Sequence, residues 1–344
     1  MALNFDLVDP AELTGFVRTL PGPATYTLNQ FLNDDNIGDI DAEFDTLIET
    51  NRAARFRAWD SETDVGKRNR LERKRVSLPP LGQKLVVGEE ARLRLEMARA
   101  GGDNSNGMIR AIYNDAVTNT NAVLARMELA RGQVLTTGKM DLTQDGLAGI
   151  QADYGVDPSH FPVATTVWTD YVDSDPLEDM RTWADLYTLD SGEPPAYALT
   201  SRTAVGHMLR NNKVRGLAAA NGVTPSMISR QQLNQLLESF DLPMLVEYNT
   251  LIDVDGTSTR PIPNDKMVFL PANPRSLGRT MWGITAEALE LVGLDNPAIT
   301  FEEAPGLVGV VTREGDPVRT WTKVTGVGMP VIEDPRKLLT AELF

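Results

Sequence analysis

The sequence of 344 residues contains no cysteine and only two histidines. The absence of cysteine excludes disulfide frameworks, thiolate zinc sites, iron–sulfur clusters and cysteine nucleophiles. A catalytic triad would have to use His160, in an expected loop, or His207, in an expected helix where a packed or surface position is typical. We therefore predict no catalytic residue, no metal and no cofactor. The opposing hypothesis is an enzyme that uses His160 with nearby acids.

Long apolar runs and the common catalytic motifs are missing as well. No stretch approaches the roughly 18 apolar residues of a membrane span, and the N-terminal MALNFDLVDPAELTGF has acids where a signal peptide has bases. The phosphate-loop, dinucleotide-binding, hydrolase and zinc-protease motifs do not occur. The sequence thus predicts an intracellular protein without a membrane segment.

The sequence has 33 basic and 48 acidic residues, so its net charge is -15. A surface of this sign repels phosphate, which disfavours general binding to nucleic acid. If DNA is a partner, the protein would enclose it and would not recognise its base sequence. The hydrophobic content of 42% is that of a globular protein, and the length suffices for two or three domains.

Residues 51–77 depart from this balance, with nine bases and four acids and therefore a net charge of +5. The central DSETDVGK is typical of a turn, and its flanks hold few apolar residues, so we predict an exposed hairpin that reaches about 40 Å. Because a lone two-stranded ribbon is marginal in water, it should rest on another subunit. A solvated basic loop without a partner is the alternative.

The expected partner surface is acidic, either on the long helix described next or over residues 153–193, because residues 151–200 hold ten acids and a single base. The predicted inter-subunit contacts are Arg52, Arg55, Phe56, Arg57, Trp59, Arg68, Arg70, Leu71, Arg73 and Arg75.

The strongest helix signal covers residues 106–131, where apolar residues recur at steps of three, four and seven until Gly132. A hairpin around Gly138 should follow. The first 38 residues, with Pro21 and Pro23 and no sustained period, predict an extended arm that needs a surface to lie on.

The rest of the chain mixes helices and strands without regular alternation, which indicates an α+β fold. Helices are expected after the caps Asp175, Ser201 and Thr224, and a hairpin is expected at Asp255–Gly256. The loop DVDGTST has some calcium-site character, but a hairpin turn accounts for its residues.

This order of elements resembles the major capsid proteins of tailed bacteriophages, more narrowly the lambda-type major capsid protein E family. The residues that carry the resemblance are ELARGQVLTTGKM, PAYALTSRTAVGHMLRN, NDKMVFLPANPRSLGRTMWG and VIEDPRKLLTAEL. The resemblance implies the Hong Kong 97 capsid fold: an N-terminal arm (1–38), an extended loop (39–85), a peripheral domain with a spine helix (86–152 and 306–344) and an axial domain (153–305).

The resemblance also implies a function, that of a structural protein whose hexamers and pentamers form an icosahedral shell around phage double-stranded DNA. Its partners would be other copies of itself, a scaffolding protein, and portal and decoration proteins. It would assemble in the cytoplasm of the host bacterium and remain in the virion. The alternative within the same fold is an encapsulin-like compartment that encloses cargo proteins.

Overall fold

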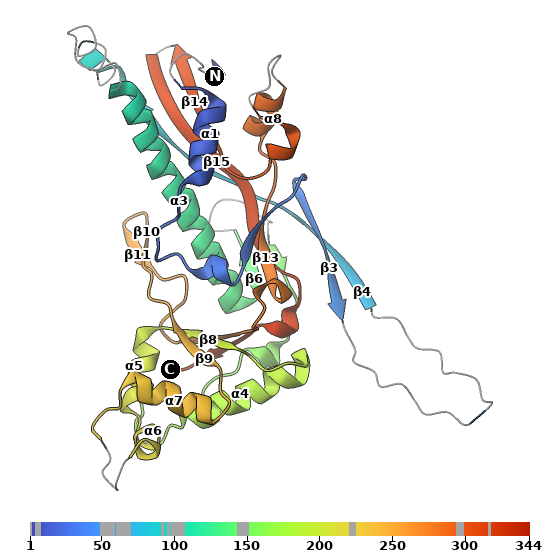
Figure 1. Ribbon diagram of the computed structural model, residues 1–344, viewed down its shortest axis with the longest axis vertical. Helices are drawn as coiled ribbons and strands as arrows, with labels where there is room; N and C mark the ends of the chain where they lie inside the picture. Colours follow the sequence, from blue (N-terminus) through green and yellow to red (C-terminus); the bar gives the residue numbers. More distant parts are fainter. Residues whose placement is uncertain are drawn as a thin grey trace.

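A computed structural model describes residues 2–3, 8–48, 59, 70–90, 93–94, 97, 107–142, 151–219, 225–293, 299–315 and 318–344. Figure 1 shows an elongated body with long strands and the long helix α3 at one end and a smaller helix-and-sheet unit at the other. The strand pair β3–β4 leaves the side of this body. The described parts of the chain therefore form two packed units and one projection.

The first unit is a six-stranded sheet covered by α3. The long strand β15 joins its parts, because it pairs with β14, β13 and β5. The strands of the sheet are β1 (Ala2–Leu3), β14 (Val308–Gly315), β15 (Val318–Ile332), β13 (Gly278–Trp282), β2 (Asn33–Asn36) and β5 (Pro80–Val87).

Helix α3 (Gly107–Thr137) confirms the predicted helix but runs six residues further than residue 131. Gly132, which we expected to end it, lies inside the helix against the backbone of Pro261, where an added Cβ would be 2.3 Å from the carbonyl oxygen. The helix ends instead at Gly138, whose φ of +65° favours glycine. Glycine at 132 thus permits a close approach of two segments.

The N-terminal segment is not an extended arm, and this prediction is wrong for residues 10–19. These residues form helix α1 (Pro10–Thr19), which Asp9 caps by accepting from the amide of Ala11. Leu13 and Val17 are buried against Gly309 of β14. A short turn, η1 (Leu28–Gln30), and strand β2 follow. The segment lies on its own chain because its apolar residues repeat at helical spacing and find a core there.

The second unit is a four-stranded sheet in the order β16-β12-β8-β9, with helices packed around it. Its apolar core is separate from that of the first unit and includes the stacked rings of Trp168 and Trp183. The strands are β8 (Tyr197–Thr200), β9 (Met244–Glu247), β12 (Lys266–Leu270) and β16 (Leu339–Glu342), and the helices are α4 (Pro176–Ser191), α5 (Arg202–Arg210), α6 (Asn212–Leu217) and α7 (Arg230–Ser239).

The caps at Asp175 and Ser201 are confirmed, whereas α7 begins later than predicted. Thr224 lies outside the described residues, and Ser229 caps α7 through a capping box with Gln232. The hairpin at Asp255–Gly256 is confirmed as β10 (Ile252–Val254) and β11 (Thr257–Thr259). Strands β9 and β12 do not extend it, because both pair with β8.

Two strands and one helix pack with another unit than the predicted domain boundaries give. β13 belongs to the sheet under α3, although residues 153–305 were assigned to the other domain. β16 pairs with β12 in the four-stranded sheet, although the C-terminal stretch was assigned with the spine helix. Helix α8 (Ala286–Val292) packs with β14 and thus also lies with the first unit. Sequence order hides these exchanges because both strands pair with partners far away in the chain.

Candidate subunit interfaces

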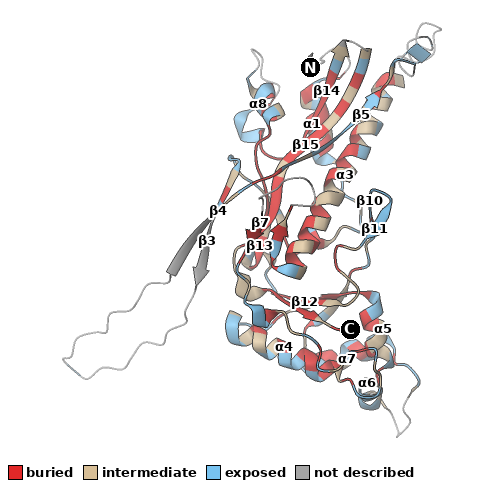
Figure 2. Cartoon of the chain, turned by 180° about the vertical axis from the view of Figure 1, so that it is seen from behind, coloured by how far each residue is buried: buried red, intermediate tan, exposed pale blue. Residues whose placement is uncertain are grey.

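The β3–β4 hairpin is the most conspicuous candidate for contact with another molecule. Strand β3 (Asp41–Ile48) pairs antiparallel with β4 (Arg70–Ser77), from Asp41 opposite Ser77 to Ile48 opposite Arg70. The two views in Figures 1 and 2 both show this pair running away from the body. Of the basic segment 51–77 that we predict to form a hairpin, only Trp59 and β4 are described, and the strand that pairs with β4 precedes this segment.

The root of this hairpin is held firmly in the body. The amide of Leu78 donates to Ile40 at 2.9 Å, and the amide of Gly328 donates to Pro79 at 3.1 Å. Gly283 lies so close to the root that an added Cβ would be 2.5 Å from the carbonyl oxygen of Asp39. The direction in which the hairpin leaves the body is therefore set by backbone contacts.

Much of the hairpin's charge is balanced within the hairpin itself. Strand β3 holds three acids and no base, and β4 holds four bases and one acid, so the charges of -3 and +3 cancel. Arg75 pairs with Asp41 at 2.5 Å and lies 4.0 Å from Glu43. The hydrogen bond from Arg75 lowers the pKa of Asp41. Arg75, a predicted inter-subunit contact, thus has its partner within its own chain.

The structure describes only some of the other predicted inter-subunit contacts. Trp59 is described, and its side chain is 98% exposed. The backbone places Arg70, Leu71 and Arg73 in β4. The remaining five lie outside the described residues: Arg52, Arg55, Phe56, Arg57 and Arg68.

A polar network that the sequence analysis missed lies under α3. Glu128 is fully buried, and its carboxylate accepts from the amide of Leu28 at 2.9 Å and from the hydroxyl of Tyr248 at 3.0 Å. Its second oxygen lies 3.3 Å from Arg131, which is also buried. Burial and the charge of Glu128 raise the pKa of Tyr248.

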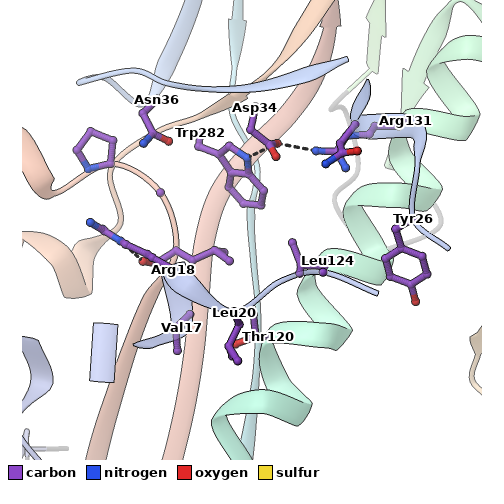
Figure 3. A pocket seen from close by; sticks show the side chains of 15 residues that line it. Val17, Arg18, Leu20, Tyr26, Asp34, Asn36, Thr120, Leu124, Arg131 and Trp282 are labelled. Atoms are coloured by element: carbon purple, nitrogen blue, oxygen red, sulfur yellow. Dashed lines mark hydrogen bonds and ion pairs between the residues drawn. The ribbon is translucent and has the colours of Figure 1, made fainter. Parts of the chain in front are cut away.

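Arg131 continues this network toward the edge strand β2. Its guanidinium donates to Thr280 at 2.9 Å and to Asp34 at 2.5 Å, and the indole of Trp282 donates to Asp34 at 2.8 Å. Figure 3 shows Arg131, Asp34 and Trp282 at a pocket of about 310 Å³ between the N-terminal segment and α3. The only hint in the sequence is the spacing of Glu128 and Arg131, three residues apart within the predicted helix. The network ties β2 and β13 to the helix.

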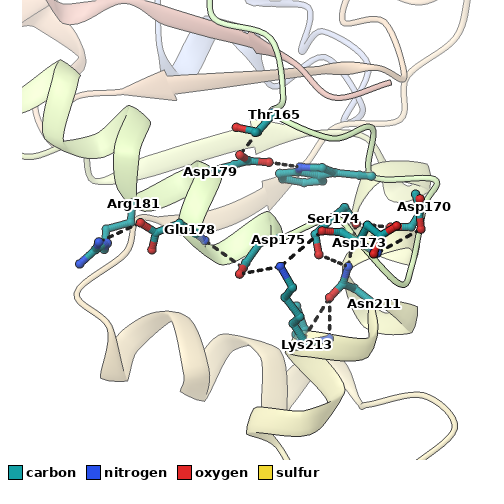
Figure 4. Close-up of polar contacts among 12 residues, drawn as sticks. Thr165, Asp170, Asp173, Ser174, Asp175, Glu178, Asp179, Arg181, Asn211 and Lys213 are labelled. Carbon is teal, nitrogen blue, oxygen red and sulfur yellow. Dashed lines mark hydrogen bonds and ion pairs between the residues drawn. The ribbon is translucent and has the colours of Figure 1, made fainter.

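The acidic segment 153–193 is used largely for its own folding, as Figure 4 shows. Asp179 accepts from the indole of Trp168 at 2.9 Å, and Asp175 caps α4 and pairs with Lys213 at 3.3 Å. The buried amide of Asn211 donates to Ser174. Most of these acids therefore have partners in the same unit.

The histidines also have structural positions. His160 is fully buried, with its ring nitrogens 2.7 Å from the carbonyl oxygen of Leu338 and 2.9 Å from the carboxylate of Asp190. His207 lies 3.0 Å from the hydroxyl of Tyr171 and packs against the ring of Phe344. Because both ring nitrogens of His160 are occupied, its arrangement favours a structural role over proton transfer. Among the described residues, no cluster of acids and histidines could hold a metal ion.

The sequence matches the family described as phage major capsid protein E over residues 9–341. The chain belongs to this family. It is a structural family, and its membership makes this chain a capsid component of a virion. The sequence of this capsid protein matches no curated protein. In the described part of the chain, no helix is long and apolar enough to cross a membrane.

Solved structures support the fold of this capsid protein. It is similar to a protein assigned as a prophage capsid protein of Escherichia coli CFT073, with 17% identity, a TM-score of 0.61, and coverage of 98% of this chain and 99% of the other. A phage-related protein of Bordetella bronchiseptica RB50 has 15% identity, a TM-score of 0.54, and coverage of 99% and 98%. The capsid of Myoviridae phage XM1 has 13% identity, a TM-score of 0.51, and coverage of 95% and 94%. The predicted α+β fold of the Hong Kong 97 type is confirmed.

The carboxylates of the acidic segment should make this capsid protein sensitive to acid. Asp170 accepts from the amides of Val172 and Asp173 at 2.9 and 3.2 Å, and these bonds lower its pKa below the usual 3.8. A group whose pKa is lower in the folded state adds stability above its unfolded pKa and loses it as the pH falls through the folded value. Hydrogen bonds donated by the hydroxyl and the amide of Ser159 lower the pKa of Asp157 in the same way.

We therefore expect the melting temperature to stay level from about pH 7 to 5 and to fall below about pH 4. Circular dichroism across this range would measure it. The matched variant is Asp170→Asn, which keeps the acceptor oxygen but does not titrate. Its curve should be flatter than that of the wild type, and an identical curve would show that Asp170 takes no part in the acid response.

Proposed function

We propose that copies of this chain form the hexamers and pentamers of an icosahedral shell that encloses phage double-stranded DNA. The observation that carries the proposal is the β3–β4 hairpin, which projects from a body that otherwise completes its own cores. An isolated ribbon is marginal in water, so the hairpin gains its support from a neighbouring copy. The family match favours this assignment over the cargo compartment.

The two units take different places in this proposal. The six-stranded sheet with α3 is the peripheral domain, and the four-stranded sheet with α4 to α7 is the axial domain around the symmetry axis. The hairpin is the extended loop. The net charge of -15 favours a shell that contains DNA without binding its sequence.

The hairpin's contacts in the shell depend more on apolar side chains than on charge. Because β3 and β4 balance each other and the acids of residues 153–193 are mostly engaged, charge alone provides little attraction between these surfaces. Trp59, which is exposed in the single chain, is the strongest described anchor. An aromatic side chain that becomes buried at an interface contributes more to binding than an exposed ion pair does.

Assembly in the host cytoplasm with a scaffolding protein, and later contacts with portal and decoration proteins, are parts of the same proposal. Expression in bacteria together with the scaffolding protein, followed by electron microscopy, tests it. We expect closed particles of uniform diameter with sixfold and fivefold clusters. Purified protein that stays monomeric with the scaffold present would contradict the proposal.

A further inference from the structure

Helices α5 and α6 form a basic face on the axial unit. Together they hold four bases and no acid, a charge of +4. Lys213 pairs with Asp175, and Arg215 donates to the carbonyl oxygen of Pro225 at 2.6 Å. The guanidinium groups of Arg202 and Arg210 are left, with no hydrogen-bond or ion-pair partner in the described part of the chain. Both residues are exposed.

The stretch from α4 to Glu193 has the opposite character, with five acids and one base and therefore a charge of -4. Asp179 is buried, Glu178 pairs with Arg181, Asp190 pairs with His160, and Glu193 pairs with Lys337. Among the described residues Asp185 makes no hydrogen bond and no direct ion pair; its charge acts only at longer range on Arg181, which already pairs with Glu178.

One helical turn after Asp185, on the same face of α4, lies Leu189. Its side chain is 81% exposed, more than any other large apolar side chain described except that of Trp59. The basic face has an exposed apolar residue as well, since Leu217 at the end of α6 is 54% exposed. Each surface therefore combines a charged group that lacks a direct partner with an exposed apolar side chain.

The two surfaces lie apart in the subunit. Helix α4 begins beside α6, where Asp175 meets Lys213, and its second half lies about 15 Å further along the helix axis. Figures 1 and 2 show α4 and α5 toward opposite sides of the axial unit in both views. The faces cannot meet within one chain. Copies arranged around an axis would bring one face of each against the other face of the next.

We propose that the basic face of one copy, with Arg202 and Arg210, binds the second half of α4 of the adjacent copy, with Asp185 and Leu189. This inference rests on the proposed function and names the surfaces that close its rings. The contact is heterologous, and such a contact closes a ring when the rotation between copies divides a full turn. The charges set the orientation of the two copies, and Leu189 and Leu217 supply the apolar area.

Charge reversal tests the proposal. In Arg210→Glu and in Asp185→Arg, like charges meet at the contact, and we expect the assembled fraction in sedimentation velocity of co-expressed protein to fall about tenfold or more. With both reversals in one chain, opposite charges meet again, and the assembled fraction should return to within about threefold of the wild type. Melting temperatures of the free subunits should be unchanged, because both side chains are exposed.

The matched control is Glu238→Arg, which reverses an exposed acid on α7 of the same unit. It should leave assembly unchanged. Single reversals that assemble like the wild type, a double reversal no better than the singles, or a control as harmful as Asp185→Arg would each overturn the inference. These outcomes are distinct from failure of the proposed function, in which the wild type itself forms no particles.

Discussion

Replacing residues 45–73 by an Asn-Gly turn is expected to give a folded subunit that no longer assembles. The turn joins Phe44 to Lys74, which are partners in the β3–β4 register. Asn-Gly suits a two-residue connection between antiparallel strands. The body should keep its stability, because both of its cores and the root contacts of Leu78 and Gly283 remain.

The assembly should fail because the shortened chain has lost its reach. Figure 1 shows β3 and β4 leaving the body, so this replacement takes away the segment that we propose extends to a neighbour. Electron microscopy of co-expressed protein measures particles, and circular dichroism verifies the fold. Particles as abundant as those of the wild type would show that the hairpin is dispensable for assembly.

A milder variant, Trp59→Ser, keeps the hairpin and removes its aromatic anchor. A side chain that is 98% exposed contributes almost nothing to the fold of the free subunit, so its melting temperature should not change. Any effect must then come from contacts between copies. We expect the assembled fraction to fall about tenfold, the loss typical of an interface aromatic residue.

The second large effect concerns the network under α3. Arg131→Met keeps the apolar stem of the side chain but leaves the buried Glu128 without its cation and Asp34 without one of its two donors. Removal of one partner of a buried ion pair costs about 3–5 kcal/mol of folding free energy. Urea unfolding followed by tryptophan fluorescence measures this loss.

Two further variants make the measurement specific to the network. Arg110→Met changes an exposed arginine of the same helix, and its effect should stay within about 0.5 kcal/mol. The double variant Glu128→Gln with Arg131→Met should cost less than the sum of the two single changes, because each removes the other's partner. A loss below about 1 kcal/mol in Arg131→Met would contradict the stabilising role of the network.

Much of the local structure could be predicted from the sequence because its causes are local. The spine helix follows from an apolar stripe, and the helices after Asp175 and Ser201 follow from their caps. The hairpin at Asp255–Gly256 follows from its turn residues. The basic stretch indicates only the second strand of the long hairpin, because β4 lies within it whereas β3 precedes it.

The predictions that failed depend on contacts between distant segments. Gly132 looked like the end of a helix, but the space it leaves is filled by the backbone of Pro261. The N-terminal segment looked extended, but α1 and β2 find partners in β14 and β13 far away in the chain. The neighbouring sequence does not show which distant segment such a contact reaches.

Composition and charge by themselves determined that this protein has no cysteine chemistry and that its acidic surface disfavours binding to DNA. Only the tertiary structure decided which charges remain available to another molecule. It pairs Arg75 with Asp41, encloses Glu128 and Arg131 under α3, and leaves Arg210 of α5 and Asp185 of α4 exposed. A count of charges along the chain cannot distinguish these cases, because the fold alone sets the distance between a charge and its partner.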